Sequence, residues 1–595
     1  MRNMRITLQK LRKFALENLR WLPNFKPGEH TALIIQAFII GILAGLLNIA
    51  FRSTMEFVNN VIFKGGSTLL GVDQGGLHLL LVPLLPMAGA LLLIPLSKGF
   101  PGQVNGYGFP QFLETVNIKG GVIKLRNILL KTLAPALTIG SGGSAGVEGP
   151  IAIIGGTVGS GVGQLFKVSG NRMRLLIAAG CAGGIAATFN APIAGVMFAM
   201  EIVLLGNYEL ASFSAIVIAS GIATVISRGH YGAFPAFPVP QYDLVSMYEI
   251  PLYMILGLIV GTLAVLYIRI FYGVRKKFDN LKLHPQLKPV FGAFIVGCIG
   301  IFLPQIMGNG YEFIEDALSG KIILPVIFLL IFFKMGATAV TLGSGGAGGV
   351  FAPALFIGAM TGGTFGLIVH ALFPVQTASA GAYATVGIGS FLSAATHAPL
   401  TGIFLLFEMT GNYKIIIPLM FASIIGTLVA KRLKADSIDT EELTQKGIRI
   451  HAGREVAIMS SVKVKDVLHG DIPTVHEHTT LYELIELMIE KERYHIPVIN
   501  EKDEMVGIVS IQDVRPVMFD EDIKRIVRAV DIATEKVITL GPYDNLNTAM
   551  EKFSLKDIDE IPVVDVLYPR KVIGMVSRRD VISAYNKEVL KKQVH

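Results

Sequence analysis

The sequence predicts a polytopic all-α membrane domain followed by a smaller α/β soluble domain. Hydrophobic residues make up 52% of the 595 residues and charged residues only 16%, against about 25% charged residues in a typical soluble domain. Long apolar stretches follow one another up to Lys431, after which the chain becomes charged and alternates short β-rich and helical stretches. Each part also contains an internal repeat. This composition excludes an intrinsically disordered chain and argues against a wholly soluble enzyme.

The N-terminal segment, residues 1–30, is basic and precedes the first apolar stretch. Its positive charge predicts a cytosolic N-terminus. The whole chain has 52 Lys and Arg residues against 44 Asp and Glu, a net charge of +8. We interpret this excess as a juxtamembrane bias and not as a sign of nucleic-acid binding. The two cysteines, Cys181 and Cys298, offer neither a disulfide framework nor a zinc site, and no metal site is expected.

Apolar stretches define the predicted membrane domain, residues 31–433. They cover residues 31–51, 77–96, 128–139, 175–205, 211–226, 250–272, 290–304, 322–333, 352–373 and 415–430. Several reach the roughly 20 residues that span a bilayer. Others are shorter or are interrupted by Gly-Ser-Gly-Gly, and interrupted helices are tolerated in a membrane only where they face protein or a water-filled cavity. A linker, 434–455, and a soluble domain, 456–595, follow.

The membrane domain contains two matched blocks of sequence. Gly140-Ser-Gly-Gly, Gly146-Val-Glu-Gly-Pro, Ala187-Thr-Phe-Asn-Ala-Pro and Glu201 follow one another in the first block. The second block has Gly343-Ser-Gly-Gly, Gly349-Val-Phe-Ala-Pro, Ala395-Thr-His-Ala-Pro and Glu408 in the same order. Paired halves with interrupted helices indicate a transporter-type site where the repeats meet, near the bilayer midplane.

Three loops have the same feature, since each places Gly and Pro just before an apolar helix. Helix N-termini with free amides and a positive dipole end bind anions, and glycine lets the backbone approach a bound ion closely. The alternative is that they are ordinary Gly/Pro breaks between spans. The candidate anion-binding residues are Gly106, Tyr107, Gly108, Phe109, Gly146, Val147, Gly149, Gly349, Val350, Phe351 and Ala352. Lys131, in an apolar helix, could add positive potential to the path or extend to the membrane interface.

Glu148 is the candidate gating and proton-accepting residue. A carboxylate among anion-binding amides competes with the anion for the same site, and protonation removes its charge. The alternative is a glutamate that only caps the following helix. Glu201 and Glu408 also lie in apolar stretches, and as repeat-equivalent residues they are expected to be structural.

These loops and the Phe-Asn-Ala-Pro and Thr-His-Ala-Pro-Leu-Thr-Gly blocks resemble the CLC family of chloride channels and chloride/proton exchangers over about residues 30–440. The tail resembles a tandem CBS-domain pair over about residues 455–590. The resemblance implies two inverted repeats with broken helices, a homodimer with one pore per subunit, cytosolic termini and no required cofactor. Glu148 matches the family's gating glutamate, and a proline at 150 matches chloride-type rather than fluoride-type members.

The sequence departs from the commonest family pattern at four positions. Val147 replaces a frequent arginine. Tyr107 stands where a serine often donates to the central anion, and Ile202 stands where proton-coupled exchangers carry an internal glutamate. Asp439 stands where a pore tyrosine is usual, so it is a doubtful anion-binding candidate. We hypothesise that Tyr107 supplies the phenolic donor while Asp439 turns away to solvent; a shift of register around Asp439 is the alternative.

Because isoleucine cannot carry a proton, Ile202 favours a passive voltage- or pH-gated chloride channel with Glu148 as its gate. The alternative is a chloride/proton antiporter that uses Glu148 and a non-standard internal proton path. A CBS-bearing cation transporter would need intramembrane carboxylate clusters, and an intramembrane protease would need HExxH, GxSxG or paired aspartates. Neither set occurs in the apolar stretches.

In the tail, a Gly-x-x-Ser-x-x-Asp pattern recurs. Aspartate can accept hydrogen bonds from ribose hydroxyls, and hydroxyls or a helix N-terminus can hold phosphate. CBS pairs typically bind adenine nucleotides in this manner, which predicts ATP, ADP or AMP here. Alternatively the aspartates only start helices and the pair binds nothing. The candidate nucleotide-binding residues are Thr474, Ser510, Asp513, Thr539, Ser577, Arg578, Arg579 and Asp580, with Asp580 favoured over Asp513.

Overall fold

The computed structural model describes residues 29–594 except 169, 207–209, 234–241, 243–244, 322, 449–458, 460–461, 471 and 557. The chain divides into two compact units, Met1–Glu442 and Leu443–His595, and each is treated by itself. The basic N-terminal segment lies almost wholly outside the described residues, as do residues 449–455 of the predicted linker. Earlier residues of that linker, Ser437, Ile438 and Asp439, are buried within the first unit.

The first unit is helical apart from one short bridge between loops, as far as it is described. Its first half contains α2 (Glu29–Val58), α3 (Gly65–Leu69), α4 (Leu84–Gly99), α5 (Phe109–Asn117), α6 (Arg126–Gly140), α7 (Glu148–Leu165), α8 (Gly170–Phe189), α9 (Pro192–Phe198) and α10 (Leu210–Tyr231). Its second half contains α11 (Glu249–Asn280), α12 (Lys288–Phe302), α13 (Tyr311–Leu318), α14 (Leu324–Gly343), α15 (Phe351–Leu372), α16 (Ala380–Thr396), α17 (Pro399–Thr410) and α18 (Ile416–Leu433). The short α19 (Glu441–Gln445) follows.

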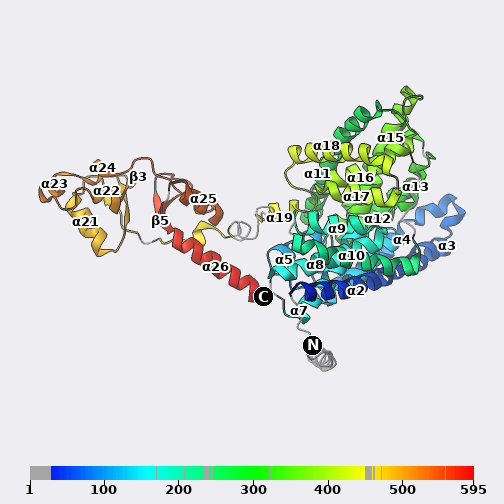
Figure 1. Cartoon of the computed structure of the whole chain (residues 1–595), viewed down its shortest axis with the longest axis horizontal. Helices are drawn as coiled ribbons and strands as arrows, with labels where there is room; N and C mark the ends of the chain where they lie inside the picture. Colours follow the sequence, from blue (N-terminus) through cyan, green and yellow to red (C-terminus); the bar gives the residue numbers. More distant parts are fainter. Residues whose placement is uncertain are drawn as a thin grey trace. The chain divides into compact units, whose positions relative to one another are not determined.

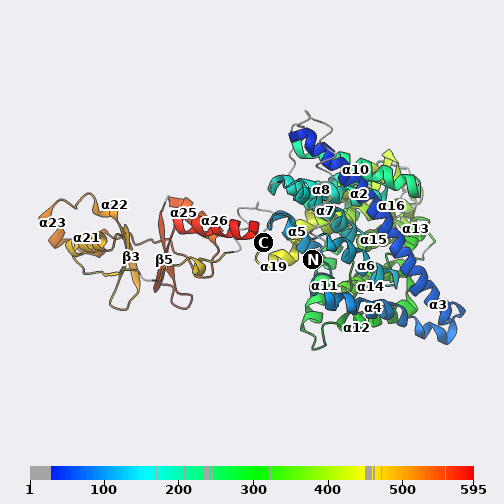
Figure 2. The same ribbon diagram turned by 90° about the horizontal axis from the view of Figure 1, so that it is seen from below.

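The two halves are built alike, which confirms the repeat. In the first half, α8 packs on α7 and on α10, and α10 packs on α2. In the second half, α16 packs on α15 and on α18, and α18 packs on α11. Figures 1 and 2 show the first set as a group that includes α2, α8 and α10.

Glycines allow the closest helix contacts in both halves. A Cβ on Gly155 of α7 would lie 2.1 Å from the carbonyl oxygen of Gly180 on α8. In the second half, a Cβ on Gly358 of α15 would lie 2.4 Å from the carbonyl oxygen of Gly387 on α16. Small residues at membrane helix interfaces let the backbones touch, so part of the glycine excess has a packing role.

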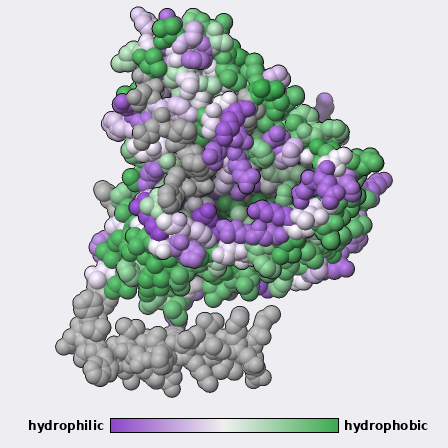
Figure 3. Space-filling view, turned by 90° about the vertical axis from the view of Figure 1, so that its right-hand side faces the viewer, coloured by the Kyte–Doolittle hydropathy of each residue, from purple (hydrophilic) through white to green (hydrophobic). Residues whose placement is uncertain are grey.

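The surface of the first unit is suited to a bilayer. Eight of its described helices are long and apolar enough to cross a membrane. Large apolar side chains are exposed on the outside, among them Leu46, Phe57 and Leu129. Figure 3 shows broad apolar areas on one face of the molecule. The chain is an integral, multi-pass membrane protein.

The second unit repeats one α/β motif. The first copy has β1 (Val475–His476), α21 (Leu481–Glu490), β2 (His495–Ile499), β3 (Met505–Ser510), α22 (Ile511–Val514), α23 (Glu521–Ile526) and α24 (Ala529–Ile532). The second copy has α25 (Leu546–Lys556), β4 (Glu560–Val564), β5 (Val572–Ser577) and α26 (Arg578–Val594). Strands β2 and β3 pair antiparallel, as do β4 and β5, and β1 lies parallel to β2.

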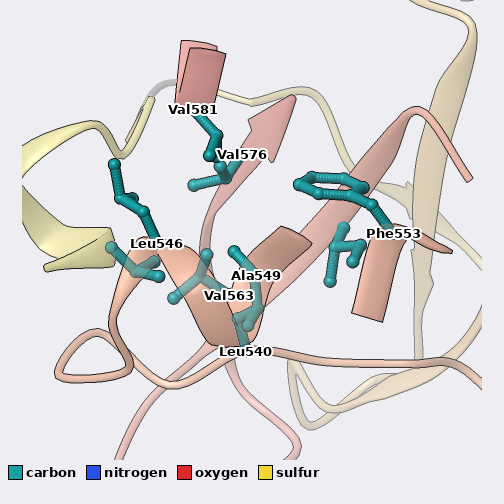
Figure 4. Close-up of a cluster of buried hydrophobic side chains, with 9 residues drawn as sticks. Leu540, Leu546, Ala549, Phe553, Val563, Val576 and Val581 are labelled. Atoms are coloured by element: carbon teal, nitrogen blue, oxygen red, sulfur yellow. The ribbon is translucent and has the colours of Figure 1, made fainter. Parts of the chain in front are cut away.

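Equivalent residues occupy equivalent places in the two copies. His495 lies opposite Ser510 across β2 and β3, and Glu560 lies opposite Ser577 across β4 and β5. One apolar core surrounds β2 and β3 and another surrounds β4 and β5, and Val464, which precedes both strand pairs in the sequence, belongs to the second core. Figure 4 shows the core of the second copy, which includes Leu540, Leu546, Ala549, Phe553, Val563, Val576 and Val581.

Candidate functional site

The three glycine-containing loops meet inside the first unit. Two backbone hydrogen bonds of 2.7 Å join Gly146 and Gly349, one in each direction. The amide of Gly106 donates to the carbonyl of Gly346 at 3.1 Å, so the first loop joins the same cluster. Gly106 has a φ of +74°, in the left-handed region that glycine adopts without strain. Helices α5, α7 and α15 therefore start from one cluster of loops.

A small enclosed space lies where the loops meet. Its volume is about 10 Å³ and its lining includes Gly108, Gly149 and Gly348, one residue from each loop or its approach. Such a space accepts about one water-sized particle. The apolar candidate residues Phe109, Val147, Val350 and Phe351 are buried at the helix starts, so their contribution to anion binding could come only from the backbone.

Glu148, the first residue of α7, is completely buried among these loops. Its Oε2 accepts a hydrogen bond of 3.1 Å from the amide of Ala352 in the first turn of α15. Its Oε1 accepts a hydrogen bond from the Tyr311 hydroxyl. A Cβ on Gly146 would lie 2.3 Å from Oε2, so only glycine leaves room for the carboxylate there. The carboxylate thus accepts a hydrogen bond from a helix-start amide of the kind that would otherwise bind an anion.

Tyr107 and Asp439 form a second buried carboxylate–tyrosine pair. The Tyr107 hydroxyl donates to Oδ1 of Asp439, and the two residues are 4% and 1% exposed. The hypothesis that Asp439 turns away to solvent is therefore wrong, because the phenol of Tyr107 holds the carboxyl inside the protein. The proposed phenolic donor is present, but its hydrogen bond goes to Asp439.

A larger cavity of about 460 Å³ adjoins the first loop and is rich in basic residues. Tyr107 and Lys131 line it together with Arg126, Arg275 and Lys288. The Lys131 ammonium lies against the loop, because a Cβ on Gly108 would be 2.8 Å from its Nζ. Clustered cations raise the local concentration of anions. The structure thus places Lys131 beside the first loop, and its addition of positive potential to the anion path stays a prediction.

Two residues beside the site escaped the sequence analysis. Lys334 of α14 is fully buried, and its Nζ donates to the carbonyls of Ile306 and Gly308 at 2.9 and 3.0 Å. These carbonyls belong to the segment that leads to Tyr311. The repeat carried a signal for Lys334, which precedes Gly343-Ser-Gly-Gly by the same spacing as Lys131 precedes Gly140-Ser-Gly-Gly. Tyr311 had no comparable signal.

Glu201 and Glu408 cap each other's helices. Glu201 accepts from the amides of Leu400 and Thr401 at 3.0 and 2.7 Å, in the first turn of α17. Glu408 of α17 accepts from the amides of Ile193 and Ala194 at 2.8 and 2.7 Å, in the first turn of α9. This reciprocal arrangement supports the structural role expected for both residues.

The two copies in the second unit enclose a cleft of about 840 Å³. Several predicted nucleotide-binding residues line it, namely Ser510, Asp513, Ser577, Arg578 and Arg579. His495 and Glu560 also line it, and Nδ1 of the histidine lies 3.3 Å from Oε2 of the glutamate. The sequence analysis missed this pair, although the two residues hold equivalent positions in the repeat.

Thr474, Thr539 and Asp580 are not among the residues that line this cleft. Asp580 accepts a hydrogen bond from the Ser577 hydroxyl, as Asp513 does from the Ser510 hydroxyl at 2.7 Å, and it lies 3.3 Å from Nε2 of His469. Burial raises the pKa of Asp580, but hydrogen bonds from Ser577 and His469 bring it below its usual value overall. Of the two aspartates, Asp513 is among the residues that line the cleft and Asp580 is not, and the preference for Asp580 stays a prediction.

Comparisons with protein families match both units. The family described as voltage gated chloride channel matches residues 88–431. The CBS domain family matches residues 464–520 and 529–587.

Individual relatives and solved structures agree with these matches. A ClcB-like protein of Ralstonia nicotianae is 34% identical over 420 residues, covering 69% of this chain and 96% of the relative. The H(+)/Cl(-) exchange transporter ClcA of Vibrio campbellii is 31% identical, covering 69% and 89%. Chloride channel protein CLC-f of Arabidopsis thaliana is 29% identical, covering 92% and 79%. The structure of a slow cyanobacterial Cl-/H+ antiporter matches with a TM-score of 0.63 and 27% identity, covering 69% of this chain and 97% of that chain.

Proposed function

Because this chain belongs to the CLC family of voltage-gated chloride channels and transporters and carries a tandem CBS pair, we propose that it exchanges chloride for protons across a membrane. Its general activity is CLC-type chloride transport. The sequence favoured a passive channel, but the alternative, an antiporter, has the better support. Relatives that match most of the membrane unit are named H(+)/Cl(-) exchange transporters.

One observation carries the proposal: the buried Glu148 carboxylate rests on the amide of Ala352 at the start of α15. An ionised Glu148 neutralises the positive end of that helix and excludes an anion from the same amides. When Glu148 takes up a proton, its charge is lost and chloride can replace it. When chloride leaves, the carboxylate returns and releases the proton. Each cycle therefore links the movement of an anion to the movement of a proton.

The test uses the full-length protein in liposomes. A chloride gradient should drive protons uphill in the wild type. Glu148→Ala should keep chloride flux but lower proton uptake by about tenfold or more, since it removes a proton-transfer group. Glu56→Ala is the matched control, because Glu56 is an exposed carboxylate of α2, and it should behave as wild type. Chloride flux without uphill proton movement in the wild type would instead establish the passive channel.

We also propose that an adenine nucleotide binds between the CBS copies and regulates transport. Asp513 offers a carboxylate for ribose hydroxyls, and Arg578 and Arg579 offer positive charge for phosphate, all within one cleft. Calorimetry with ATP, ADP and AMP on the full chain tests this proposal. Binding heat that disappears in Asp513→Ala would support it. No heat with any of the three would leave a structural role for the tail.

The assembly and orientation remain proposals that rest on family resemblance. We propose a homodimer with one pore per subunit and with both termini in the cytosol. We also extend the transport domain to about residue 442, because residues 437–439 are buried in the first unit. Light scattering in detergent tests the dimer. Protease digestion of sealed, oriented vesicles tests the side on which the tail lies.

A further inference from the structure

Coupled exchange needs a route for the proton between Glu148 and the far side of the membrane. Position 202 offers no titratable group, because Ile202 is aliphatic and 4% exposed. The buried carboxyl groups of the first unit are therefore the candidates for a second proton carrier, on the premise of the proposed exchange function.

Most of these carboxyl groups already have hydrogen-bond or ion-pair partners within the protein. Glu201 and Glu408 each accept from two backbone amides at a helix start. Glu442 accepts from Gln111 and forms an ion pair of 2.6 Å with Arg275. Glu249 is the first residue of α11. Tyr272 and Arg275, near the other end of that helix, contact residues 438 and 442, so Glu249 lies at the opposite end of α11 from these residues.

Asp439 differs from Glu201, Glu408 and Glu442, and it shares with Glu249 a buried carboxylate oxygen that has no hydrogen-bond partner among the described residues. Unlike Glu249, Asp439 contacts a residue of the first loop, Tyr107. It is 1% exposed, its Oδ1 accepts from the Tyr107 hydroxyl, and its Oδ2 has no hydrogen-bond partner among the described residues. A buried carboxylate with an unpartnered oxygen is costly. Adding a proton to that oxygen removes the charge and lowers this cost.

The backbone around Asp439 is held in place. The amide of Ile438 donates to the carbonyl of Ala395 at 3.0 Å. The carbonyl of Ile438 accepts from the Tyr272 hydroxyl at 2.7 Å. The backbone beside Asp439 is therefore fixed, and its carboxyl lies inside the protein.

Tyr107 connects Asp439 with the loop cluster. A Cβ on Gly149, the residue after Glu148, would lie 3.7 Å from Cε2 of the Tyr107 ring. The same tyrosine lines the basic cavity of about 460 Å³. One side chain thus touches the cluster that holds the gating glutamate, the cavity and the carboxyl of Asp439.

The charges around Asp439 determine how it titrates. Tyr107 faces it directly, and Tyr267 and Tyr272 of α11 interact with its charge. The nearby Arg275 is paired with Glu442. Asp439 follows the last membrane span, and burial raises its pKa to about 7, against the lowering effect of the Tyr107 hydrogen bond. The carboxyl can therefore gain and lose a proton near neutral pH.

We propose that Asp439 is the second proton-carrying carboxyl of the exchange cycle and serves where position 202 cannot. One proton adds to a carboxylate oxygen of Asp439. The same proton later leaves Asp439, passes through water in the anion path and adds to the carboxylate of Glu148. No electrons are transferred, and Tyr107 positions the Asp439 carboxyl throughout.

Chloride-driven proton uptake and chloride flux are measured together on the full chain in liposomes. Asp439→Asn should keep chloride flux and lower the proton-to-chloride ratio by about tenfold or more, while Asp439→Glu, which keeps a titratable group, should retain coupling. Asp316→Asn is the control, since Asp316 is partly exposed on α13 and pairs with Lys321 at 3.6 Å, and its ratio should match wild type. Tyr107→Phe removes a hydrogen bond that lowers the pKa of Asp439, so the pH profile of coupling should move to higher pH.

The outcomes separate the two proposals. A wild type that moves no protons overturns both the exchange function and the relay. A coupled wild type whose Asp439→Asn variant is equally coupled overturns the relay alone, even if its chloride flux rises. If Asp439→Asn does not fold, Tyr107→Phe decides, and an unchanged pH profile overturns the relay.

Discussion

The two halves of the membrane unit have the same scaffold and different chemistry. Glycine contacts join α7 to α8 and α15 to α16 in the same manner, and Glu201 and Glu408 cap each other's helices. The two halves differ in their residues at the loop cluster. The position of Glu148 in the first half corresponds to Phe351 in the second. One half therefore supplies the titratable group and the other supplies the Ala352 amide that receives it.

The two equivalent lysines diverge in the same way. Lys131 lines the basic cavity and lies against Gly108 of the first loop. Lys334 donates to the carbonyls of Ile306 and Gly308, and its Nζ lies 5.0 Å from the centre of the Phe356 ring. The comparison indicates that the repeat symmetry extends to the packing of the helices and not to the contacts of the polar side chains near the loop cluster.

The largest effect should come from the symmetric glycines. Gly155→Ala and Gly358→Ala each push a Cβ into a backbone carbonyl of the neighbouring helix, and overpacking of this kind costs about 1–3 kcal/mol or more. Both variants should lose most of their folded, monodisperse protein in size-exclusion chromatography. Gly221→Ala is the control, because its Cβ meets nothing within 4 Å. A strong loss of folded protein for only one of the two variants would show that the two halves do not depend equally on their glycine contacts.

Substitution of the two equivalent lysines should lower transport in one case and stability in the other. Lys131→Met should lower chloride flux by roughly tenfold, because a cation beside the anion path is lost. Lys334→Met should leave two buried carbonyls without their donor and lower the free energy of unfolding by about 1–3 kcal/mol. Flux in liposomes and thermal unfolding of both variants check this contrast. Equal effects on flux would show that the second half also contributes its lysine to the path.

The reciprocal caps should give two matched, moderate effects. Glu201→Gln and Glu408→Gln each replace a carboxylate that accepts from two amides with a group that has one carbonyl oxygen. One amide then loses its partner, at a cost of about 1–3 kcal/mol of stability. Unfolding temperatures should fall by similar amounts in the two variants, with the proton-to-chloride ratio unchanged. A change of the ratio in Glu201→Gln alone would assign this residue to proton transfer.

The sequence predicted the scaffold well and the pairings at the site only in part. Repeated motifs carried the fold class, the loops and Glu148, because glycine, proline and helix starts have local signatures. The partners of Glu148 and Tyr107 could not be predicted, since Tyr311 and Asp439 reach them across 163 and 332 residues of chain. The sequence hypothesis turns Asp439 to solvent because a carboxylate that faces an anion site repels the anion, but in the structure Tyr107 pairs with Asp439. Contacts this distant depend on how the two halves fold together.

The smallest effect should appear in the soluble repeat, where the two copies also differ in charge. Arg578 stands where the first copy has Ile511, and both line the cleft. Arg578→Ile makes the copies alike, so it should weaken ATP binding by about tenfold, the loss of one charged phosphate contact. Arg525→Ile, which changes an exposed arginine outside the cleft, should bind ATP as wild type in calorimetry. Unchanged ATP affinity in Arg578→Ile would place the phosphate elsewhere and make the charge difference between the copies irrelevant to nucleotide binding.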